Sequence, residues 1–209
     1  MRPKSWTYTP AATTGNGYAA GVTGATWTLT ATTANDGLAH KTTILNNSAT
    51  NHSGKTALVT GTDADGNAQT ETITLPNGNV TVTGSKYFKT VTSVVPSATV
   101  GADTMDIGWS AVAYSPTIPI DWRSTIGANL GIVVTGTINV TVQEAYQDVW
   151  AQTAPASGLS WFSISALTSK TANTQGTATP NATAIHLLIN SVTATATVTL
   201  VFAQTQVLF

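Results

Sequence analysis

Apolar and polar residues alternate with a period of two along much of the chain. Over residues 25–32, Ala, Trp and Leu fall on one face and four threonines fall on the other. The same alternation returns at 137–142 and at 193–202. Strict alternation is typical of a strand with one buried face and one face toward solvent or a polar neighbour, as in an antiparallel sandwich.

Further strands are predicted between turn signals rich in Asn, Asp, Gly and Pro. The turn signals fall at 35–37, 51–54, 65–67, 76–78 and 180–181. The strands between them are expected at 38–45, 55–62, 68–75, 87–95, 111–114, 131–135 and 184–192. The best helical window, 143–152, starts inside an alternating strand, so little helix is expected.

The spacing of these elements and the prolines divides the chain. Pro116 and Pro119 restrict the backbone to extended conformations and remove ladder donors, which indicates a linker at 113–122. We therefore predict an all-β protein of two antiparallel β-sandwich, jelly-roll-like domains. These are expected at 25–112 and 123–209, after an irregular N-terminal arm at 1–24.

Composition strengthens the β prediction and excludes several function classes. Threonine, a β-branched residue that suits strands, supplies about a fifth of the 209 residues. Charged residues make up 8% and hydrophobic residues 42%, the reverse of a disordered chain. Eight Lys and Arg against nine Asp and Glu are too few for a basic face, so neither nucleic acid nor an anionic membrane is an expected partner.

Low charge also favours association with copies of the chain or with a larger assembly. The chain has no cysteine, which excludes disulfides and thiolate metal sites. No apolar run follows the first charges and none reaches membrane-spanning length, so we expect synthesis in a cytoplasm without a signal peptide or a membrane span.

Motifs for specific chemistry are weak. The run Ser-Gly-Lys-Thr at 53–56 lacks the first glycine of a phosphate-binding loop and precedes a strand instead of a helix. Asp63 and Asp65 resemble the start of a calcium loop, but Ala68 and Thr74 occupy positions where that loop needs other residues. An Asp-Gly hairpin is the favoured interpretation, and a cation at Asp63 and Asp65 stays open.

No catalytic group, metal site or cofactor is predicted, and the chain is not expected to be an enzyme. The carboxylate pairs Asp103/Asp106 and Glu144/Asp148 carry no sign of flanking a cleft, and they are expected to be solvated turn residues. The three histidines, His40, His52 and His186, share no ligand spacing, and no Gly-x-Ser-x-Gly elbow exists. The six tryptophans are expected mainly in core and interface packing, with a sugar-binding platform as an alternative.

Two runs resemble segments of small β-rich virion proteins of tailed bacteriophages: TGTDADGNAQTETI at 60–73 and GSKYFKTVTS at 84–93. Shorter stretches at 139–143, 148–150 and 184–190 are similar to such proteins as well. The resemblance implies a structural role as capsid cement (decoration), head fibre or tail component, with no catalytic residues. It also implies synthesis in the host cytoplasm and action in the virion, through surface buried against symmetric neighbours.

The favoured hypothesis is a capsid cement protein on the capsid surface, a homotrimer that contacts the major capsid protein or another virion protein. Alternatives are a tail tube, adaptor or fibre component and, from another class, a carbohydrate-binding module. Because 1–24 shows no periodic apolar face, its aromatic side chains are expected to anchor on a neighbouring subunit. The predicted partner-binding residues are Arg2, Lys4, Trp6 and Tyr8, with Phe209 at the apolar C-terminal end.

Overall fold

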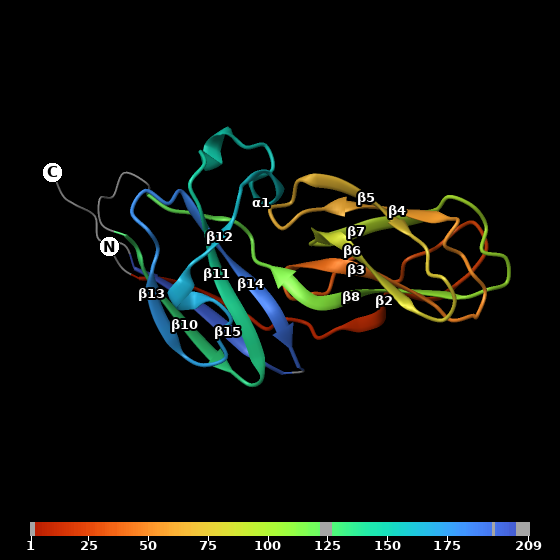
Figure 1. Cartoon of the computed structure of the whole chain (residues 1–209), viewed down its shortest axis with the longest axis horizontal. Helices are drawn as coiled ribbons and strands as arrows, with labels where there is room; N and C mark the ends of the chain where they lie inside the picture. Colours follow the sequence, from red (N-terminus) through yellow and green to blue (C-terminus); the bar gives the residue numbers. More distant parts are fainter. Residues whose placement is uncertain (1–2, 122–126, 194, 204–209) are drawn as a thin grey trace. The chain divides into compact units, whose positions relative to one another are not determined.

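A computed structural model describes residues 3–121, 127–193 and 195–203 (Figure 1). The protein is mostly β, with three antiparallel sheets that include a curled half-barrel, and almost no helix. The predicted β class and low helix content are confirmed. The chain divides into two compact units, unit 1 with residues 1–12 and 114–209 and unit 2 with residues 13–113.

Unit 2 is built from seven strands. They are β2 (Thr14–Val22), β3 (Ala39–Asn46), β4 (Thr56–Thr62), β5 (Ala68–Thr74), β6 (Thr81–Phe88), β7 (Thr90–Pro96) and β8 (Met105–Tyr114), the last of which ends at the unit boundary. Strand β4 is the centre of a three-stranded sheet in the order β5-β4-β7. Strand β2 pairs with β8, and β3 pairs with β6.

Alternation places one face of each strand in the unit 2 core. Val59 of β4 and Val94 of β7 are buried opposite each other, together with Phe88, Met105 and Ile107. The turn between β4 and β5 reaches positive φ at Gly66, where glycine avoids the Cβ penalty. The Asp-Gly sequence thus closes the hairpin that the sequence predicted.

Unit 1 contains two groups of paired strands. The first is a four-stranded sheet in the order β1-β15-β10-β13, formed by Lys4–Tyr8, Thr197–Ala203, Asn129–Thr135 and Thr174–Thr177. In the second, β11 (Ile138–Ala145) pairs with β12 (Phe162–Ser163) and with β14 (Ala184–Val192), which also pairs with β9 (Ile118–Pro119). Short helical turns are η1 (Val149–Ala151), α1 (Pro155–Gly158) and η2 (Ser165–Leu167).

The apolar positions of unit 1 follow the same period of two. Ile132 of β10 and Leu200 of β15 lie directly opposite each other, and both are buried. Val142 of β11 and Leu187 of β14 form another buried pair. The threonines that alternate with them occupy the opposite faces, which explains how so Thr-rich a chain still forms a core.

The N-terminal segment differs from the predicted irregular arm. Lys4–Tyr8 forms β1, which pairs along its whole length with β15, and Thr14–Val22 forms β2. The backbone of β15 pairs with that of β1. The Trp6 ring also packs edge-on against the Phe202 ring, with ring centroids 6.4 Å apart. Only two apolar residues alternate in β1, too few to reveal a strand in the sequence.

Two other expectations also need correction. Residues 25–32 form no strand, because the backbone amides of Thr30 and Ala31 both donate to the carbonyl of Tyr18, while Trp27 is buried as the alternation requires. The single strand expected at 87–95 is instead the end of β6 and most of β7. These are separated at Lys89, whose amide donates to the Thr62 carbonyl.

The residues predicted as a linker at 113–122 also pack within a unit as far as they are described. Ile118 and Pro119 form β9 against β14, and Ile118 is buried. Ser115 is buried as well, and its hydroxyl accepts a hydrogen bond from the Leu187 amide at 2.9 Å. The two prolines therefore shape a short edge strand rather than a free connection.

Candidate functional site

The segment that follows strand β11 exposes large aromatic side chains. Strand β11 ends at Ala145, and the chain passes through η1 and α1 before β12 returns to pair with β11, so that Phe162 lies opposite Glu144. Trp150 is 77% exposed, Phe162 is 53% exposed and Tyr146 is 44% exposed. Exposed aromatic groups of this size mark binding surfaces more often than ordinary solvent faces.

Glu144 fixes the position of Tyr146. The Glu144 carboxylate is buried and accepts hydrogen bonds from the Thr179 amide at 2.8 Å and the Thr179 hydroxyl at 2.7 Å. The Tyr146 hydroxyl donates to the same carboxylate at 2.6 Å. Partial burial, and next the hydrogen bond to Glu144, raise the pKa of Tyr146, so its hydroxyl stays protonated and keeps donating.

Trp150 is held by a local hydrogen bond at the start of η1. The Asp148 carboxylate accepts from the Trp150 backbone amide at 2.9 Å, which satisfies one of the amides left free at a helix start. Val149 between them is buried against Leu159 and Ala184. The backbone that carries the exposed indole is therefore anchored to the core of unit 1.

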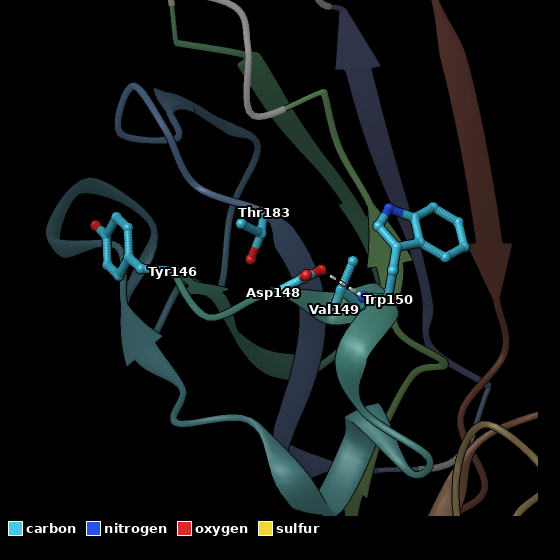
Figure 2. A pocket seen from close by; sticks show the side chains of 5 residues that line it. All are labelled: Tyr146, Asp148, Val149, Trp150 and Thr183. Carbon is cyan, nitrogen blue, oxygen red and sulfur yellow. Dashed lines mark hydrogen bonds between the residues drawn. The ribbon is translucent and has the colours of Figure 1, made fainter.

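These residues line a pocket, which we call the Tyr146–Trp150 pocket. It has a volume of about 520 Å³ and is lined by Tyr146, Asp148, Val149, Trp150 and Thr183. Figure 2 shows the phenol and the indole at opposite sides, with Asp148 and Thr183 between them. The volume lies within the roughly 300–1,000 Å³ of small-molecule sites. Among the described residues that line the pocket, one carries a carboxylate and none carries a basic group.

The loop around the pocket is tied down at several points. Gln147 accepts from the Ser160 amide at 2.6 Å, and the Trp161 indole donates to the Ala156 carbonyl at 3.3 Å. The Thr183 hydroxyl donates to the carbonyls of Ala145 and Gln147. These hydrogen bonds hold the pocket walls in place, which lowers the entropy cost of binding a ligand.

His186 in strand β14 is enclosed by aromatic rings. Its ring stacks on Trp161 with centroids 3.7 Å apart and on Tyr114 at 4.6 Å, while Nε2 is hydrogen-bonded to the Gln143 side chain at 2.7 Å. His186 is fully buried, and among the described residues its Nδ1 has no hydrogen-bond partner. Burial lowers the pKa of His186 to about 3, so the ring is neutral and serves as packing.

The predicted partner-binding residues do not join this pocket. Lys4, Trp6 and Tyr8 lie on β1, where Lys4 is exposed and the two aromatic side chains are half-buried. Burial raises the pKa of Tyr8, and a hydrogen bond with Ser115 opposes that shift. Arg2 and Phe209 lie outside the described residues. A partner contact through these five residues stays a prediction.

The weaker motifs resolve into turns and local networks. The Asp63 carboxylate accepts from the amides of Asp65 and Asn67 at 2.9 Å each, as expected of a hairpin turn. Residues 53–56 lead directly into β4, without the helix that a phosphate loop needs. In the part of the chain that the structure describes, no group of three or more His, Cys, Asp or Glu side chains could hold a metal ion.

The remaining carboxylates and histidines are used locally. Asp103 is hydrogen-bonded to His52 at 2.9 Å, and that bond, with others from Thr50 and Ser48, lowers the pKa of Asp103. Asp106 accepts from the Gly21 amide at 2.7 Å. His40 is buried between Asp36 and the Ser110 carbonyl, at 2.7 and 2.8 Å.

Sequence reasoning found only part of the pocket. It named Asp148 as an expected turn residue and counted Trp150 among six tryptophans expected mainly in core and interface packing, but it missed Tyr146 and Thr183. The usable signal was the end of alternation at Ala145, followed by a run that mixes aromatic and polar residues. Nothing in the sequence marks Thr183 as a pocket residue. Only the pairing of β11 with β14, which sets its neighbour Ala184 opposite Ala145, brings it to the pocket.

No protein-family model matches the chain, and neither a curated protein nor a solved structure matches it. None of the helices among the described residues combines the length and the apolar character needed to cross a membrane.

Proposed function

We propose that the chain is a structural protein of a bacteriophage virion, a capsid cement (decoration) protein that is made in the host cytoplasm and attaches to the capsid surface. The resemblance of residues 60–73 and 84–93 to small virion proteins supports this proposal. Both runs lie on paired strands of unit 2, the first on the hairpin of β4 and β5 and the second on β6 and β7.

The observation that carries the proposal is an uncharged outer sheet face in unit 2. Leu58 lies opposite Val95 on one side and Thr72 on the other, so the three share a face, and Leu58 and Val95 are 43% and 52% exposed. The neighbouring rows of paired residues on this face are uncharged as well. One row is Thr60, Thr70 and Ser93, and the other is Thr56, Thr74 and Ser97.

A solvent-facing sheet ordinarily carries charges that keep it soluble and prevent association. This face carries none, and its exposed apolar pair is suited to burial against a flat neighbouring surface. We name the residues Leu58, Thr72 and Val95 the unit 2 outer row, and we assign it the contact with the major capsid protein or with sister copies in a homotrimer.

We also infer that each unit is a β-sandwich in its own right, with jelly-roll-like connectivity. The support is that strands from both sheet groups of unit 1 bury the alternate residues that face inward, such as Ile132 and Leu187. In unit 2, Val59 and Ile107 do the same from different sheets.

Co-sedimentation with purified empty capsids of the phage that carries the gene tests the proposal. The wild-type chain should sediment with the capsids, and Leu58→Asp should weaken that attachment at least tenfold. Val133→Asp replaces a comparably exposed side chain of unit 1 and is the matched control, with binding retained. A wild-type chain that stays in the supernatant would show the proposal to be wrong.

Copy number distinguishes the tail alternative. A cement protein is expected in roughly the numbers of the capsid subunits, whereas a tail adaptor or fibre is present in few copies. Quantitative mass spectrometry of purified virions measures this ratio directly. A low copy number with retained virion association would move the assignment from the head to the tail.

A further inference from the structure

We propose that the Tyr146–Trp150 pocket of unit 1 binds a neutral oligosaccharide. This function is independent of the virion assignment, because it uses different residues from the unit 2 outer row. The proposal starts from the most exposed aromatic side chain named above, the Trp150 indole, and from its position at the rim of a pocket of about 520 Å³.

The charges of the lining select against an ionic ligand of either sign. Among the described lining residues an anion would meet the Asp148 carboxylate and no basic side chain, and that carboxylate would repel it. A small organic cation needs aromatic faces gathered around one point, within about 6 Å of the charge. Figure 2 shows instead that the Tyr146 and Trp150 rings lie on opposite sides of the pocket. A neutral ligand with more than one flat face fits this arrangement.

An oligosaccharide has that shape and chemistry. The faces of its sugar rings present C–H groups, which are attracted to the negative face of an indole or phenol ring. Its hydroxyl groups project from the ring edges and need polar partners. Two separated aromatic platforms with polar groups between them can therefore hold successive sugar rings of one chain.

Asp148 and Thr183 supply the polar partners between the platforms. Each carboxylate oxygen accepts more than one hydrogen bond, so Asp148 can accept from sugar hydroxyls while it caps η1. The Thr183 hydroxyl uses its proton toward backbone carbonyls, which leaves its oxygen as an acceptor. Both groups thus act as acceptors for a ligand that is rich in donors.

The platform on the Tyr146 side is preorganised. The bond from the Tyr146 hydroxyl to the buried Glu144 fixes one end of the ring, and Phe162 contacts its side with centroids 5.7 Å apart. A ring held in this way loses little freedom when a sugar stacks on it. Tyr146→Phe removes the hydroxyl but keeps the ring, so it tests positioning separately from stacking.

The experiment is titration of the full chain with neutral hexasaccharides of glucose, galactose and N-acetylglucosamine, followed by calorimetry and by tryptophan emission. We expect at least one of the three to bind and to shift the emission to shorter wavelength. Trp150→Ala should weaken binding at least tenfold, and Trp150→Phe should retain most of the affinity while it abolishes the emission shift. Asp148→Asn should weaken binding by a smaller factor.

Val80→Ala removes exposed apolar surface from unit 2, outside the unit 2 outer row, and is the control, with saccharide affinity unchanged. Circular dichroism establishes that the variants fold. Absence of binding to all three saccharides overturns the proposal, as does binding that Trp150→Ala leaves intact. Loss of capsid attachment in Trp150→Ala, with no saccharide bound by the wild type, would identify the pocket as a protein contact and would also overturn it.

Discussion

At the scale of single residues, His186 should make the stability of the folded chain depend on pH. The stacked rings of Trp161 and Tyr114 exclude water from its imidazole, and burial lowers its pKa to about 3. The unfolded chain binds a proton at the ordinary histidine pKa of about 6.5, whereas the folded chain does not. Protons therefore favour the unfolded state, and stability should fall as the pH falls from about 6.5 toward 3.

This prediction is measured by urea unfolding between pH 7 and pH 4.5. The free energy of unfolding should decrease with a slope that approaches about 1.4 kcal/mol per pH unit, and His186→Gln should flatten that slope. The Asp103 carboxylate, whose pKa is lowered, loses its contribution only below its ordinary pKa, so it stays outside this range. An equal slope in the variant and the wild type would contradict the role of His186.

Gly61 is a second residue with a testable effect on stability, because its surroundings leave no room for a side chain. It lies at a register shift between β4 and β7, and a Cβ there would be 1.9 Å from the Thr90 carbonyl oxygen. Gly61→Ala should therefore lower the free energy of unfolding by about 1–3 kcal/mol, since backbone must move. Gly54→Ala, at a turn with open space around it, should change stability by under about 0.5 kcal/mol. Chemical unfolding of both variants checks this, and equal effects would contradict it.

At the scale of elements, strand β1 should stabilise unit 1. It pairs with five residues of β15, the hydroxyls of Thr7 and Thr199 lie 2.8 Å apart, and Trp6 covers Phe202. Removing residues 1–8 would leave the edge of β15 without its partner. We expect the truncated chain to melt several degrees lower, at about 2–4 °C for each kcal/mol lost. Differential scanning calorimetry measures this, and the exposed Lys4→Ala is the control.

An unchanged melting temperature after this truncation would instead support a free arm, the interpretation that the sequence favoured. That interpretation rested on the absence of a periodic apolar face in the first residues. The contrast shows what alternation can and cannot reveal. Alternation at 137–142 identified the start of β11, and alternation at 193–202 identified most of β15, because apolar residues recur at every second position over several residues.

Shorter or more irregular elements left no such signal. Strand β1 depends on a partner almost two hundred residues away, and no local pattern records that pairing. Residues 25–32 alternate yet form no strand, and the amides of Thr30 and Ala31 both donate to the Tyr18 carbonyl instead of to a neighbouring strand. The pocket shows the same limit, because its walls come from the segment after β11 and from Thr183, the residue before β14. Pairing over long distances in the chain decides these features.

At the scale of the whole molecule, low charge should make association insensitive to salt. Charged residues make up 8% of the chain and the net charge is −1, so electrostatic steering between copies is weak. Salt screens charge–charge contacts but leaves apolar burial in place. Copies could join into a homotrimer through the unit 2 outer row or through strand β1. In either case the stability of the homotrimer should not depend on charged side chains.

Sedimentation velocity with light scattering tests this in 50 mM and 500 mM NaCl. We expect a species of three times the 21.5 kDa chain mass in both buffers, with a dissociation constant that changes less than about threefold. Leu58→Asp places a charge in the unit 2 outer row and should dissociate the trimer, whereas Val133→Asp should not. A trimer that dissociates on adding salt would show that charged groups hold it together. A monomer in both buffers would show that the chain associates only with other virion proteins.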